Sequence, residues 1–132
     1  MLEAHVIQTK GFKNVGDGDA SGFQVTVRCP YYRGIWASLI EDAELTVDGE
    51  TFGSDSVSWT LDRASYSTAE LAESDDVRWA FEEPAILTAE KPGGLLPGLH
   101  DVRVAVTWRW SYIPVEMQPT TNISSRKLVL VR

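Results

Sequence analysis

The side chains most able to carry out chemistry are sparse in this sequence. The two histidines, His5 and His100, lie far apart, and neither has a metal-ligating neighbour at short spacing. Cys29 precedes a proline at the end of an expected strand, which favours a structural thiol over a reactive one. Segment 17–22 begins like a calcium loop, but Arg28 stands where that loop needs a bidentate glutamate. From the residues alone we expect no catalytic, cofactor-binding or metal-ligating set in this chain.

Two aromatic segments are better candidates for a functional role, as parts of a partner interface. Tyr, Trp and Arg are the residue types that most often anchor protein–protein contacts. The first segment follows an expected strand and supplies Tyr31, Tyr32, Arg33, Gly34 and Ile35. The second leaves another expected strand and supplies Tyr112, Ile113, Pro114 and Met117. We predict that both segments are loops that contact a partner, and ordinary internal packing is the competing interpretation.

Strands are the elements that must position these loops. In the stretch 100–110, the apolar side chains occupy every second position: Val102, Val104, Val106, Trp108 and Trp110. That period of two predicts a half-buried antiparallel strand. The stretches 23–28 and 57–61 alternate in the same way, and strands are also expected over 4–9, 84–90 and 128–131.

Local signals predict one hairpin and one helix. Asp48-Gly49 separates two strand-like runs, 43–47 and 50–52, and this dipeptide favours a type I′ turn because both turn residues need positive φ. Ser67 and Glu70 have the spacing of a capping box at the start of a short helix.

Glycine, proline and asparagine mark the expected loops, which span 11–22, 91–98 and 114–125. Many short strands joined by such turns predict an all-β fold. We expect a single antiparallel β-sandwich domain over residues 1–132, Ig-like or jelly-roll-like, with one short helix.

Composition restricts the partners and the compartment. The 132 residues include 19 Asp and Glu against 12 Lys and Arg, a net charge of −7 that disfavours nucleic acid and anionic membranes. The charge is uneven: 62–83 holds seven acids and two bases, whereas 101–132 holds two acids and five bases. One face is therefore expected to be acidic and another mildly basic. The lone cysteine and the absence of a signal-peptide pattern or long apolar run favour a cytoplasmic protein.

Four segments together carry a likeness to a known family. They are 11–15 (GFKNV), 28–34 (RCPYYRG), 61–63 (LDR) and 108–114 (WRWSYIP). In their order and spacing the chain resembles the small β subunit of bacterial C-glycoside deglycosidases, over about residues 10–131. No single motif among them is diagnostic.

The resemblance implies an auxiliary subunit. The family's larger α subunit resembles sugar-phosphate isomerases, with a TIM barrel and a divalent metal, commonly manganese. Its substrate is a C-glucoside, such as a flavonoid C-glucoside, oxidised at the sugar 3-position. A base removes the C2 proton that the ketone acidifies, the metal supports the enolate, and the C1–aglycone bond breaks by elimination. This chain would then hold no cofactor, and the 3-oxo-C-glucoside would bind at or near its interface with the α subunit.

Two other functions remain open at this point. A stand-alone intracellular carbohydrate-binding module would stack sugar rings on exposed tryptophans, and burial of all five would remove its basis. An enzyme in its own right would use His100 with nearby acids, since fold does not settle function. A closed pocket that contains His100 and two carboxylates would support the enzyme.

Overall fold

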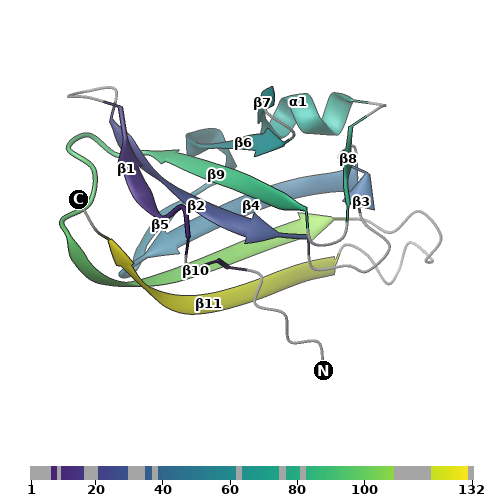
Figure 1. Ribbon diagram of the computed structural model, residues 1–132. Helices are drawn as coiled ribbons and strands as arrows, with labels where there is room; N and C mark the ends of the chain where they lie inside the picture. The colour runs from purple at the N-terminus through teal and green to yellow at the C-terminus, as the bar shows by residue number, and fades with distance from the viewer. Residues whose placement is uncertain are drawn as a thin grey trace.

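Two antiparallel sheets lie face to face in this protein, with the apolar core between them (Figure 1). The computed structural model describes residues 7–8, 10–16, 21–29, 35–36, 39–61, 64–74, 77–80, 83–108 and 120–130. The expected all-β antiparallel sandwich with one short helix is confirmed. Within the described ranges, no helix is long and apolar enough to cross a membrane.

The first sheet has five strands in the order β1-β2-β9-β6-β7, and all its pairings are antiparallel. Its strands are β1 (Lys13–Val15), β2 (Gly22–Arg28), β9 (Pro84–Glu90), β6 (Val57–Leu61) and β7 (Ala64–Ser67). The strands expected over 23–28, 57–61 and 84–90 are confirmed. Strand β7 was not expected, because Tyr66 is the only large side chain in its four residues and no apolar alternation marks them.

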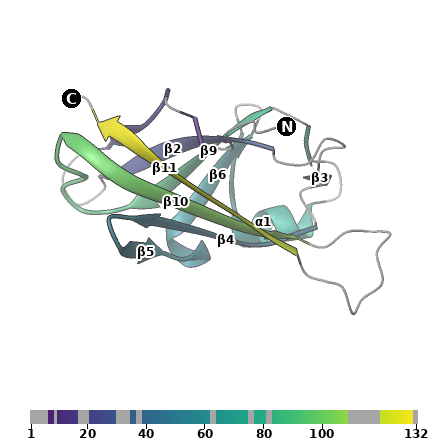
Figure 2. The ribbon, with the colours of Figure 1, turned by 90° about the horizontal axis from the view of Figure 1, so that it is seen from below.

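The second sheet has four strands in the order β11-β10-β4-β5. Its strands are β11 (Thr120–Leu130), β10 (Gly98–Trp108), β4 (Ile40–Val47) and β5 (Glu50–Phe52). The view from below shows β10 and β11 as long neighbours that cross the whole molecule (Figure 2). A separate two-stranded ribbon joins β3 (Ile35–Trp36) to β8 (Arg78–Trp79) at one end of the sandwich.

The alternation of β10 is the clearest link between sequence and core. From His100 onward its even-numbered side chains are buried, and the odd-numbered ones face away from the core. Trp108 is 4% exposed, as its period predicted, and Trp110 lies outside the described residues. In the opposite sheet, Trp59 meets Trp79 edge to face, with ring centroids 5.4 Å apart. That geometry is favourable for aromatic pairs and ties the β3–β8 ribbon to the core.

The hairpin and the helix form as their local signals predict. Asp48 has φ 50° and Gly49 has φ 89°, which is the positive pair that a type I′ turn requires. Helix α1 (Thr68–Glu73) is capped by Ser67, whose hydroxyl accepts from the Glu70 N–H at 3.0 Å. The Glu70 carboxylate in turn accepts from the Ser67 N–H at 2.8 Å. Leu71 anchors this short helix in the core.

Two of the expected loops were wrong in part. Strand β1 interrupts the expected loop 11–22, and residues 120–125 of the expected loop 114–125 belong to β11. Residues 120–125 contain only one large apolar side chain, Ile123, so their pattern does not mark a strand. They pair because β10 offers them a continuous row of backbone donors and acceptors. Of the strand expected over 4–9, the described part shows an isolated bridge between Ile7 and Val27.

Gly22 marks a close approach of two strands in the first sheet. It pairs with Glu90, and a Cβ added at Gly22 would overlap the backbone carbonyl oxygen of Ala89. A strand backbone cannot yield as a flexible side chain can. Glycine is therefore required here for space.

We predict that Gly22→Ala lowers the free energy of unfolding by about 1–3 kcal/mol, because the added methyl forces β2 away from β9. Urea denaturation followed by tryptophan fluorescence would measure the change. Gly53→Ala is the matched control, because a Cβ there meets nothing within 4 Å. The control should stay within about 0.5 kcal/mol of the wild type. Equal effects of the two substitutions would contradict the proposed crowding.

Candidate functional site

The strands that flank the two predicted contact segments end at the same end of the sandwich (Figure 1). Strand β2 ends at Arg28 and β3 begins at Ile35, whereas β10 ends at Trp108 and β11 begins at Thr120. Trp108 pairs with Ile40 at the start of β4, four residues after β3 ends. The anchors of both segments therefore lie close together, although the segments are far apart in the sequence.

Most of the predicted interface residues lie outside the described residues. They are Tyr31, Tyr32, Arg33, Gly34, Tyr112, Ile113, Pro114 and Met117. Ile35 is described as part of β3, where its backbone pairs with Trp79. Their role as a contact surface stays a prediction.

Trp36 is a further aromatic side chain at this end of the molecule. It is 45% exposed and sits on β3, opposite Arg78 of β8. The ribbon beneath it is well anchored, because Trp79 is fully buried and its Nε1–H donates to the Glu83 carbonyl at 2.7 Å. Trp36 is thus a large, partly exposed side chain on an anchored ribbon, which suits a contact with another molecule.

Three of the other tryptophans count against the carbohydrate-module hypothesis. Trp59, Trp79 and Trp108 are buried in the core, and Trp110 lies outside the described residues. A buried indole cannot stack on a sugar ring. Among the described tryptophans, only Trp36 could act as a stacking platform.

His100 has both ring nitrogens engaged. Its Nδ1 lies 2.5 Å from the Asp48 carboxylate, and its Nε2 lies 2.7 Å from the Leu96 carbonyl oxygen. Both partners can only accept when Asp48 is ionised, so the two N–H donors of an imidazolium would satisfy both contacts. The Phe12 ring packs edge to face against the His100 ring, with 5.9 Å between the ring centroids.

Electrostatics agrees with a charged pair. Burial alone lowers the pKa of His100, but the hydrogen bonds to Asp48 and Leu96 and the carboxylate charge together raise it above 6.5. The same hydrogen bond, helped by the Asp101 N–H at 2.8 Å, lowers the pKa of Asp48 below 3.8. The pair joins the β4–β5 turn to the start of β10, and it brings one carboxylate rather than two to His100.

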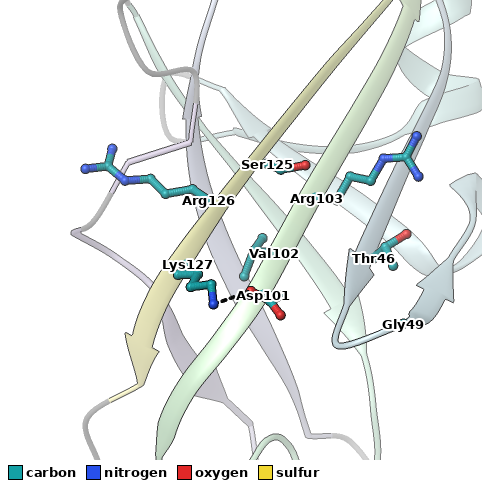
Figure 3. Close-up of a pocket in the computed structure, with 8 residues that line it drawn as sticks. All are labelled: Thr46, Gly49, Asp101, Val102, Arg103, Ser125, Arg126 and Lys127. Carbon is teal, nitrogen blue, oxygen red and sulfur yellow. Dashed lines mark ion pairs between the residues drawn. The ribbon is translucent and has the colours of Figure 1, made fainter.

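The outer face of the four-stranded sheet carries a shallow groove that sequence reasoning missed (Figure 3). Its volume is about 540 Å³, and its lining comes from β4, β10 and β11 and the turn after β4: Thr46, Gly49, Asp101, Val102, Arg103, Ser125, Arg126 and Lys127. Arg103 extends from β10 toward β4, and Lys127 reaches Asp101 at 3.8 Å. Arg126 turns away and donates to the Ile7 carbonyl at 2.9 Å. The excess of bases after residue 101 was the available signal in the sequence, and the strand register shows that Arg103 and Lys127 line one groove.

Metal ligation finds no support in the described part of the chain. No group of three or more His, Cys, Asp or Glu side chains there could hold a metal ion. Cys29 is buried and is not in a disulfide.

Comparison with known proteins decides the family. A model of the C-glycoside deglycosidase beta subunit family matches residues 2–112. A protein of that name from Eubacterium cellulosolvens is 38% identical over 130 residues, which cover 97% of this chain and 88% of the relative. The chain belongs to the C-glycoside deglycosidase beta subunit family. The resemblance seen in the sequence is thereby confirmed.

Two further relatives show the breadth of the family. A C-glycoside deglycosidase beta subunit from Microbacterium trichothecenolyticum is 31% identical over 102 residues, 77% of each chain. A 3'-dehydrocarminate deglycosidase beta subunit from a Microbacterium species is 31% identical over 102 residues, 76% of each chain. A protein of the C-glycoside deglycosidase beta subunit family is part of an enzyme complex and has a partner subunit.

We predict that the Asp48–His100 pair makes the stability of this beta subunit depend on pH. Because the folded pKa of His100 is raised, its contribution is full below pH 6.5 and disappears as pH rises through the raised value. The contribution of Asp48 is full above pH 3.8 and disappears on further acidification. The stability lost in His100→Asn should therefore be largest between these limits and smaller at alkaline pH.

Urea denaturation of the wild type and the variant from about pH 5 to pH 9 would measure this difference. Asp48→Asn is the matched variant, because asparagine also tolerates the positive φ of the turn but carries no charge. Both variants should show the same pH profile. A loss that is constant across this range would mean that the pair is not charged.

Proposed function

We propose that this chain is the auxiliary β subunit of a heteromeric C-glycoside deglycosidase that acts on 3-oxo-C-glucosides. The observation that carries the proposal is membership of the beta subunit family, with 38% identity to a relative over 97% of the chain. The relative named for 3'-dehydrocarminate adds support, because its printed name denotes an oxidised substrate.

The proposed reaction is an elimination that breaks a carbon–carbon bond. The ketone at C3 of the sugar acidifies the C2 proton, and a base removes it. The electron pair left on C2 forms a C1–C2 double bond as the bond from C1 to the aglycone breaks. The aglycone carbon takes up a proton, so the products are the free aglycone and an unsaturated 3-keto sugar. The complex is a carbon–carbon lyase in this scheme.

In this scheme the larger subunit supplies the base and the metal. We take that subunit to be a TIM barrel with a divalent cation, commonly manganese, which would supply positive charge at the sugar oxygens when bound. The engagement of both His100 nitrogens by Asp48 and Leu96 supports this division of labour.

This chain would shape the active site and stabilise the assembly, without catalytic residues of its own. The surface that we propose for this role combines Trp36 with the segments 31–35 and 112–117, whose anchors share one end of the sandwich. A 3-oxo-C-glucoside, for example of a flavonoid, would bind at or near that end. We place the complex in the cytoplasm, because one buried cysteine without a disulfide is typical of a reducing compartment.

We predict that neither subunit alone is active and that the mixture is. The assay uses a 3-oxo-C-glucoside with Mn²⁺ and follows release of the aglycone by chromatography. This chain, its co-encoded larger neighbour and the two together are compared at equal concentration. Equal activity of the neighbour alone would remove the role proposed here, and activity of this chain alone would reveal a catalytic site in it.

We predict that Tyr32→Ala and Arg33→Ala each weaken assembly by about 5- to 30-fold, as truncation of interface anchors does. Isothermal titration of the chain into its partner subunit would measure the dissociation constant. Lys13→Ala is a control for Arg33→Ala, because Lys13 is an exposed cation on β1, toward the opposite end of the sandwich (Figure 1). Unchanged affinity in both variants would place the contact elsewhere.

A further inference from the structure

Apolar side chains gather on the outer face of the four-stranded sheet. Five large hydrophobic residues are exposed in the described part of the chain, and three of them lie on this face: Leu99 at 61%, Ile123 at 53% and Val129 at 60%. Leu99 and Val129 pair directly across β10 and β11. Leu96, 80% exposed, lies in the loop that leads into β10. The solvent face of an antiparallel sheet is ordinarily polar, so this concentration indicates a contact surface.

Cationic residues occupy the middle of the same face. Arg103 and Lys127 lie between the Leu99–Val129 pair and Ile123, along the groove of about 540 Å³. Asp101 offsets Lys127 only weakly, because their side chains are 70% and 69% exposed and 3.8 Å apart. Glu44 of β4 pairs with Ala105, two residues beyond Arg103, and places a carboxylate at the edge of this cationic centre. The groove is thus a locally positive site in a chain whose net charge is −7.

We propose that this face, defined by Leu99, Arg103, Ile123, Lys127 and Val129, is the docking surface for the larger subunit of the complex. The occupant is an acidic segment of that subunit, with carboxylates against the cationic groove and apolar side chains against the flanking residues. This assignment rests on the proposed function, which requires such a partner.

Charge argues for that partner over a second copy of this chain. A two-fold dimer through this face would bring Arg103 and Lys127 of both copies together, and like charges at an interface are unfavourable.

The face also has a suitable size for a stable complex. Strands of 11 residues are about 36 Å long at ~3.3 Å per residue. Together with the eight-residue β4, these two strands present on the order of 500 Å², a large part of the roughly 800 Å² that each partner buries in a stable complex.

Continuity with the predicted contact loops adds a further argument. The same two strands, β10 and β11, are joined by segment 109–119, which contains Tyr112 and Met117. A partner that binds these loops and extends along the strands would meet Ile123 first and Lys127 next. One subunit can therefore cover both regions.

The test is binding of the full-length chain to its purified partner subunit. We expect Arg103→Glu/Lys127→Glu to weaken binding at least tenfold in isothermal titration. We also expect added salt to weaken the wild type more than the variant. Lys10→Glu/Lys13→Glu is the matched control, because it makes the same change in net charge at exposed residues of β1 and the turn before it. The control should bind within a factor of two of the wild type.

A second variant tests the apolar part and protects against misfolding of the first. Leu99→Thr/Val129→Thr keeps strand-forming residues at two exposed positions, so it should fold and bind at least fivefold more weakly. Circular dichroism and thermal unfolding confirm the fold of each variant. Normal affinity in both folded variants would overturn the docking face and leave the proposed function intact.

Two other results would also overturn this assignment. If the wild type does not bind the larger subunit at all, the proposed function fails together with the docking face. If the variants dissolve a self-association of this chain and keep normal affinity for the partner, the face binds a second copy. Sedimentation velocity of the wild type and the variants, each without the partner, measures whether this chain self-associates and so identifies the second case.

Discussion

The structure depends on the ladder that β10 makes with β11 on one side and with β4 on the other. A strand sends successive side chains to opposite faces, so β10 serves two surfaces at once. Its inner row, from His100 to Trp108, fills the core, whereas Leu99, Asp101 and Arg103 form part of the outer face. A register slip of one residue would exchange these rows, which would bury charge and expose the core. The core and the proposed docking face are therefore set by the same pairing.

Polar and aromatic contacts hold the two ends of this sandwich. At one end, Trp79 packs edge to face on Trp59 and supports the ribbon on which Trp36 is exposed. At the other, His100 bridges the Asp48 carboxylate and the Leu96 carbonyl, so the β4–β5 turn and the loop before β10 are joined. Both contacts hold connecting segments at the ends of the sandwich.

In the role that we propose, this beta subunit acts by binding its partner subunit. Its exposed features are an aromatic side chain at one end and a cationic, partly apolar sheet face, and both suit contact with a partner protein. His100 contacts the Asp48 carboxylate and the Leu96 carbonyl of its own chain through its two ring nitrogens. The family name of the relatives, a beta subunit of a deglycosidase, agrees with this distribution of roles.

Local features could be derived from the sequence alone, because their causes lie within a few residues. The alternation of β10, the Asp48-Gly49 turn and the Ser67 cap all appear in the structure as predicted, and the family likeness was visible in short segments. Tertiary structure alone decided the long β11, because residues 120–125 become a strand only beside β10. It also decided the grouping of Arg103 with Lys127 and the end that Trp36 shares with the loop anchors. Backbone pairing between distant segments sets these positions, and a one-dimensional pattern does not contain the identity of the partner strand.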